Sequence, residues 1–152
     1  MPLPPAPPAV IAECPLRDAT HARLAGDSAG RRVSVAGHAA VGITSGVVGG
    51  ISGLIAATAH RPAALATFVV STVIAGTNVA VATGSTGVAP TDARRIVDCD
   101  STLIQSYRIG YGERAKAKRG RWAIWSALIS YIAGAAALFG LVLAVLLGGN
   151  WD

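Results

Sequence analysis

Three long runs of this chain carry no Asp, Glu, Lys or Arg. They cover residues 33–60, 62–91 and 122–151, and Arg61 alone separates the first two. A helix needs about 20 mostly apolar residues to cross a hydrocarbon core of about 30 Å, so each run is long enough to span a membrane. Charged residues make up only 14% of the chain, against about 25% in soluble domains. The sequence therefore predicts an all-α integral membrane protein with three transmembrane helices.

The three spans are expected at about residues 36–58, 63–84 and 122–147. The third is the strongest, because Trp122 and Trp125 lie at one end of it and Trp151 at the other, as in an aromatic belt. Segment 69–87 is also compatible with a β-hairpin by its β-branched residues and turn residues. An open sheet in lipid would leave backbone groups unsatisfied, which favours the helix. Whether the first two spans cross fully or re-enter stays open.

The Lys and Arg residues divide the chain into regions with a predicted orientation. The Pro-rich N-terminal segment 1–32 carries four of them, the turn between the first two spans carries Arg61 alone, and loop 91–121 carries eight. Because cytoplasmic or matrix loops hold the excess of positive charge, the N-terminus and the loop are expected inside. The turn of the 33–90 hairpin and the C-terminal end of region 122–152 are then outside. A bacterial plasma membrane or the mitochondrial inner membrane is predicted.

Small residues recur at every fourth position in the first two spans. Such lines let helix backbones approach closely, which is what favours helix association in lipid. The lines are Gly42, Gly46 and Gly50; Ser45, Gly49, Gly53 and Ala57; and Thr72, Gly76, Ala80 and Gly84. We expect the first two spans to pack as a tight glycine-rich hairpin, with these glycines serving packing within the chain. The alternative is that the first span needs only one of its two lines for the hairpin and that the other line meets another subunit.

Asn78 is the one strongly polar side chain deep in the second span. It is expected to form a hydrogen bond between helices, and the alternative is that it lines a pore together with Ser71. The three histidines, His21, His38 and His60, are expected to be solvated. The predicted helix-packing interface consists of Gly42, Gly46, Gly49, Gly50, Gly53, Gly76 and Asn78.

The inner loop is predicted to hold an amphipathic helix. Thr91 can cap a helix over 92–107, whose apolar residues, such as Leu103 and Tyr107, recur at helical spacing, and Gly110 and Gly112 are expected to end it. A basic segment follows directly before the third span. It is predicted to contact anionic lipid through Arg114, Lys116, Lys118, Arg119 and Arg121. We expect this contact to be a general attraction that also anchors the topology, and the alternative is a specific headgroup site, for example for cardiolipin.

The chain carries no recognisable catalytic, cofactor or metal site. Cys14 and Cys99 lack the spacing of a metal or redox motif, and two unpaired thiols are expected. No charged residue lies within a span, no nucleophile is placed with a base, and no phosphate-binding loop occurs. We therefore expect no enzyme, no catalytic residue, no cofactor, no metal and no small-molecule substrate. Nucleic acid is not an expected partner either, since a reading element is missing.

Two classes of function fit this pattern. The first is a non-catalytic accessory or structural subunit of a larger membrane complex, of the respiratory or translocation type. The second is a self-associating pore former of the holin or effector type, in which Asn78, Ser71 and Thr77 would line a lumen. The expected partners are accordingly other membrane subunits or further copies of the chain, together with anionic lipids. The absence of a strongly amphipathic span favours the first class.

Overall fold

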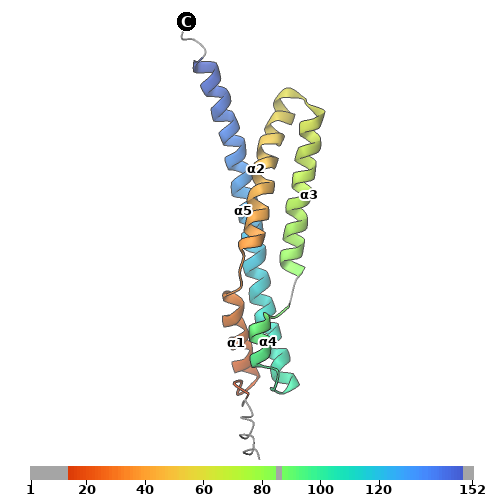
Figure 1. Cartoon of the computed structure of the whole chain (residues 1–152), viewed down its shortest axis with the longest axis vertical. Coiled ribbons are helices and arrows are strands. Elements are labelled where there is room, and N and C mark those ends of the chain that lie inside the picture. Colours follow the sequence, from red (N-terminus) through yellow and green to blue (C-terminus); the bar gives the residue numbers. More distant parts are fainter. Residues whose placement is uncertain (1–13, 85–86, 149–152) are drawn as a thin grey trace, which may run out of the picture.

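The computed structural model describes residues 14–84 and 87–148, and within them helices are the only regular secondary structure (Figure 1). The helices are α1 (Ala19–Arg31), α2 (Ala36–Ala59), α3 (Pro62–Gly84), α4 (Pro90–Arg95) and α5 (Ser101–Gly148). Three of them, α2, α3 and α5, are long and apolar enough to cross a membrane. The all-helical class and its three apolar helices are thus as the sequence predicts. Most of the Pro-rich segment, residues 1–13, and Trp151 lie outside the described residues.

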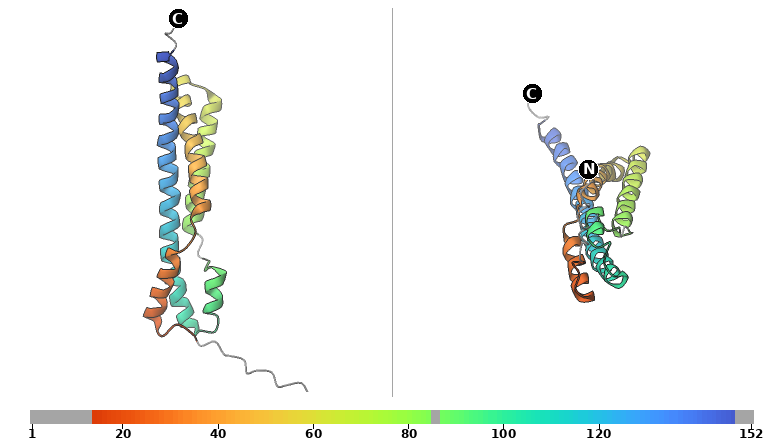
Figure 2. Two further views of the ribbon diagram at one scale, coloured as in Figure 1. Left: turned by 60° about the vertical axis from the view of Figure 1, so that its left-hand side comes forward. Right: turned by 60° about the horizontal axis from the view of Figure 1, so that its bottom comes forward.

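The α5 helix runs the length of the molecule, and the other helices lie along it (Figures 1 and 2). Helix α1 packs against its first part and α2 against its later part, while α3 lies on the far side of α2. We call residues 14–33 and 87–121 the head, and residues 36–84 and 122–148 the bundle. The head carries nearly all the charge, and the bundle carries the three charge-free runs.

The predicted helix over 92–107 is wrong in its boundaries. The structure has instead a short α4, a turn at 96–100, and then α5, which continues without a break through Gly110 and Gly112 into the third span. Glycine ends a helix when it takes a left-handed conformation, and none of the glycines that the structure describes has a positive φ. The structure therefore has a short helix, a turn and one long helix where we expected a surface helix followed by a separate span.

The ends of these helices follow from local sequence. Asp100 accepts a hydrogen bond from the Thr102 backbone N–H at 2.8 Å, as a residue that caps a helix N-terminus does, and the Thr102 hydroxyl also donates to it. These two bonds, the hydroxyl bond first, lower the pKa of the Asp100 carboxyl. Thr91 does not cap a helix, because α4 already begins at Pro90. Between α2 and α3 the chain turns at His60, with φ 50°, and Pro62 is the first residue of α3, where its missing N–H costs nothing.

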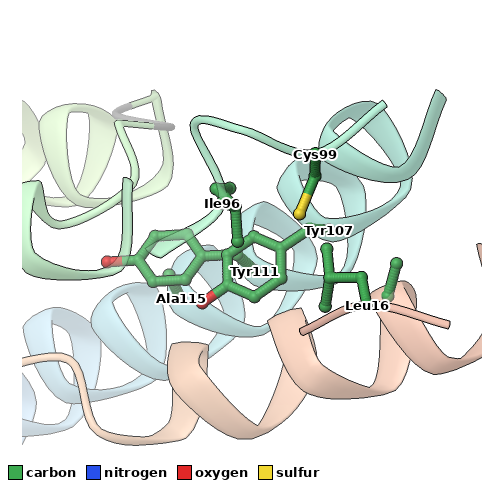
Figure 3. Close-up of a cluster of buried hydrophobic side chains, with 7 residues drawn as sticks. Leu16, Ile96, Cys99, Tyr107, Tyr111 and Ala115 are labelled. Carbon is green, nitrogen blue, oxygen red and sulfur yellow. The ribbon is translucent and has the colours of Figure 1, made fainter. Parts of the chain in front are cut away.

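The head has its own small core (Figure 3). Tyr107 and Tyr111 of α5 stack with ring centroids 6.4 Å apart, and Leu16 and Ile96 pack against them. Burial raises the pKa of the Tyr107 hydroxyl, and the nearby negative charge of Asp92 adds to the effect. This core is made from three separate segments, so it holds the chain before α1 and the 96–100 turn against the first part of α5.

The expectation of two unpaired thiols is wrong. Cys14 and Cys99 form a disulfide, with their Cα atoms 4.9 Å apart and 85 positions apart in sequence. The bond ties the segment before α1 to the turn before α5. Cross-linking two such distant positions restricts the unfolded chain more than a short loop does, so the bond stabilises the head.

Two glycines of α5, Gly110 and Gly112, test the contact between α1 and α5. A Cβ at Gly110 would overlap the Arg23 carbonyl oxygen of α1, whereas no atom of the described residues lies within 4 Å of a Cβ at Gly112. We expect Gly112→Ala to stabilise the protein by about 1 kcal/mol, since alanine favours a helix interior. Gly110→Ala should destabilise it by about 1–3 kcal/mol through overpacking. Thermal unfolding followed by circular dichroism in mild detergent measures both, and equal effects of the two changes would contradict the α1–α5 contact.

Candidate functional site

The first glycine line of α2 faces α5. A Cβ at Gly42 would overlap the Ser126 hydroxyl, and Cβ atoms at Gly46 and Gly50 would overlap the carbonyl oxygens of Ala127 and Tyr131. The two backbones are thus as close as glycine alone permits. This line is occupied within the chain, and its partner is the third span, not the second.

The second line of α2 is also occupied within the chain. A Cβ at Gly49 would lie 2.9 Å from the Ser71 hydroxyl of α3, and one at Gly53 would lie 3.0 Å from the Phe68 ring and 2.9 Å from the Tyr131 hydroxyl. Phe68 and Tyr131 meet edge to face, with ring centroids 6.1 Å apart. Both small-residue lines of α2 therefore face neighbours within the chain, and the free line of the alternative interpretation is not present on this helix.

Asn78 joins α3 to α2 near the head. Its side-chain Nδ2 donates to the His38 backbone oxygen at 2.8 Å, and its Oδ1 lies 2.9 Å from His38 Nδ1. Asn78 is buried, and two hydrogen bonds satisfy a side chain that would be costly to leave unpaired in an apolar environment. His38, expected to be a solvated residue, is instead the partner of Asn78.

The small-residue line of α3 lies on the outside. Its members Thr72, Gly76, Ala80 and Gly84 are exposed, and within the described part of the chain no atom comes within 4 Å of a Cβ on Gly76 or Gly84. Gly76, expected in the hairpin contact, therefore does not pack against α2. Beside it, a groove with a volume of ≈ 340 Å³ separates α3 from Ile124 and Leu128 of α5, and Gly46 and Gly49 of α2 contribute to its lining.

Part of the basic segment holds the head together. Lys118 Nζ donates to the backbone oxygens of Arg31 and Val33, at 2.6 and 2.9 Å, and so binds the carbonyl end of α1, where a cation is favoured. Arg114 Nε lies 3.7 Å from Asp27 Oδ1. These two predicted lipid contacts thus have partners in α1 and in the connection to α2.

The remaining members of the basic segment lie on different sides of α5. Arg119 is half-buried and lines a cavity with Val33 and Tyr111. Lys116 lies on another side, near Arg108. Arg121 lies beside Trp122, where the head meets the bundle. The five cations therefore do not form one surface, although they are close together in sequence.

Comparison with known proteins identifies no relative. No protein-family model, no curated protein and no solved structure matches the chain. In residues 14–84 and 87–148, no group of three His, Cys, Asp or Glu side chains could hold a metal ion.

Gly46→Leu tests the internal contact of α2. The larger side chain cannot fit against the Ala127 carbonyl oxygen, so we expect it to separate α2 from α5 and to lower stability by about 1–3 kcal/mol or more. The measurement is thermal unfolding of the purified protein in mild detergent. Gly37→Leu is the control, because the described residues leave open space around a Cβ at Gly37. Unchanged stability of the Gly46 variant would contradict the α2–α5 packing.

Proposed function

We propose that the protein is a non-catalytic accessory subunit of a larger membrane complex, of the respiratory or translocation type. The observation that carries the proposal is the exposed line of small residues on α3, with the groove between α3 and α5 beside it. Of the three small-residue lines in α2 and α3, this is the one that has no helix packed on it among the described residues. The expected occupant is a transmembrane helix of another subunit.

The chemistry of this face favours a helix as its partner. Apolar side chains gain little by leaving lipid for protein, so helices associate in a bilayer through close packing and hydrogen bonds. Gly76 and Gly84 offer no side chain, so a partner backbone can approach α3 as closely as α5 approaches α2. The Val and Ile residues of α3, such as Val73 and Ile74, are exposed beside the line and would flank that partner.

The pore-forming alternative requires polar side chains that face a lumen. Ser71 and Asn78 are buried; the Ser71 hydroxyl donates to the Phe68 backbone oxygen at 2.8 Å, and Asn78 is bonded to His38. Thr77 is exposed, but its hydroxyl donates to the Val73 oxygen of its own helix at 2.8 Å. These bonds leave little polar capacity to line a pore, which supports the accessory subunit.

Gly76→Leu tests the proposed assembly surface. It should leave thermal stability unchanged, because nothing in the described chain contacts that position, and yet release the protein from its complex. The measurement is native gel electrophoresis of membranes solubilised in mild detergent. Gly37→Leu is the matched control, since Gly37 is equally open but belongs to no line of small residues.

The native-gel pattern also separates the two functions. A large complex that loses this chain in the Gly76 variant alone supports the proposal. A ladder of multiples of 15.3 kDa would support the self-associating pore former. A large complex that retains both variants would contradict the role of the α3 face.

The orientation of the chain is a second part of the proposal: the head lies inside and the α2–α3 turn outside. Of the 13 Lys and Arg residues, 12 lie in the head and only Arg61 lies at the turn, and the side with the positive charge is retained inside. The Cys14–Cys99 disulfide is the observation that opposes this orientation, because disulfides persist mainly in oxidising compartments. The charge bias carries the proposal, since it involves 12 residues and acts during insertion.

Cysteine labelling tests the orientation. In a Cys14→Ser/Cys99→Ser background, Arg61→Cys should react with an impermeant maleimide added outside, and Lys116→Cys should not. The native chain should show two reactive thiols only after reduction and denaturation, because the disulfide blocks both. Labelling of Lys116→Cys from outside would overturn the orientation and would place the disulfide in the oxidising compartment.

A further inference from the structure

A cavity of ≈ 240 Å³ lies where the carbonyl end of α1 meets α5. Its lining consists mostly of long cationic side chains and one aromatic ring. The lining residues are Arg31, Arg114, Ala117, Lys118, Arg121 and Trp122. Arg31 comes from α1 and the others from α5, so only the folded head brings them together.

The cavity has an excess of positive charge. Asp27 pairs with Arg31 Nη2 at 2.8 Å and lies 3.7 Å from Arg114 Nε, and Lys118 is bonded to backbone oxygens. The side chain of Arg121 makes no hydrogen bond or ion pair with any residue that the structure describes. Four cations against one carboxylate leave a net charge of +3, so the cavity favours an anion.

The same face of α5 becomes aromatic and then aliphatic above the cavity. Trp122, Trp125, Ile129 and Ile132 follow at intervals of three or four residues and therefore share one side of the helix. Their exposed fractions are 50%, 53%, 61% and 60%. Along α5 the order is thus cation, indole and aliphatic side chain, which is the order of headgroup, interface and acyl chain across half a bilayer.

The end of α1 explains why this face is free. Within the head, α1 covers the α5 face that carries Tyr111 and Arg114: a Cβ at Gly30 would lie 2.8 Å from the Tyr111 oxygen and 2.9 Å from Arg114 Cβ. Helix α1 ends at Arg31, and α2 then packs against a different side of α5, at Ser126 and Ala127. The cavity therefore stays open where α1 ends, and we call it the shelf. The exposed face formed by Trp122, Trp125, Ile129 and Ile132 continues from it along α5, and we call this face the stripe.

We propose that this shelf binds an anionic phospholipid. The phosphate lies among Arg31, Arg114 and Arg121, whose guanidinium groups can bind phosphate oxygens through paired hydrogen bonds. An acyl chain lies along Trp125, Ile129 and Ile132. The stripe is what selects a lipid over a free anion, because a soluble phosphate gains nothing from it. The proposal needs the bundle to lie in a bilayer, but it does not need a partner subunit.

Native mass spectrometry of the full chain in mild detergent tests the site. The protein is titrated with cardiolipin, phosphatidylglycerol and zwitterionic phosphatidylcholine, and bound lipids are counted. Arg121→Gln should weaken binding of the anionic lipids about fivefold, and Arg31→Gln/Arg121→Gln should weaken it by more, since each cation near the surface contributes to attraction. Lys116→Gln is the matched control, because it removes the same charge from α5 outside the cavity. Circular dichroism checks that each variant retains its helix content.

Each outcome decides the proposal. Selective loss in the Arg121 variants, with Lys116→Gln within about twofold of the native chain, supports the site. Equal loss in all variants would show general electrostatic attraction and overturn it. Equal binding of phosphatidylcholine would overturn the anionic selectivity, and displacement of the lipid by millimolar inorganic phosphate would show a free-anion site instead. If the double variant unfolds, Arg121→Gln still gives the test, because it removes none of the described contacts between side chains.

Discussion

Close backbone contact along α5 is the interaction on which the rest of the structure depends. Gly26 and Gly30 of α1 lie against the α5 backbone in the head, and Gly42, Gly46 and Gly50 of α2 lie against it in the bundle. The contact in the head also buries the tyrosine core, whereas helices in lipid gain little free energy from burial. There, many small dispersion contacts between close backbones must hold the helices together. One long helix therefore connects the head and the bundle, and glycines on its neighbours make both contacts possible.

The arrangement of the spans could be predicted only in part, because composition marks a span but not its partner. Charge-free runs gave boundaries close to those observed: about 36–58 against Ala36–Ala59, and about 63–84 against Pro62–Gly84. Each small-residue line looks equally suitable for packing, so the sequence did not reveal that Gly46 faces α5 while Gly76 faces outward. The continuity of α5 was missed because Gly110 reads as a helix end, whereas here it is a point of close approach to α1.

The head was predicted least well, because its contacts join positions that are distant in the chain. Nothing in the spacing of Cys14 and Cys99 indicates a pair, since the disulfide follows from the packing of α1 against α5. The spacing of Ala22, Gly26 and Gly30 in α1 was a signal that could have been read. It repeats the four-residue pattern of the bundle within a polar helix, and it marks the face that meets α5. Small-residue lines thus indicate close approach outside the spans as well.

The basic residues of the head differ in how many hydrogen-bond and ion-pair partners they already have within the fold. Lys118 neutralises the carbonyl end of α1, and Arg114 shares Asp27 with Arg31; such side chains offer a ligand only part of their hydrogen-bonding capacity. Arg121 makes no hydrogen bond or ion pair with the described residues, and it lies directly before the exposed apolar face of α5 that begins at Trp122. From the sequence alone, the five cations before the third span look equally able to bind an anion. The fold makes them unequal, and Arg31, which comes from another helix, completes the group that a phosphate would meet.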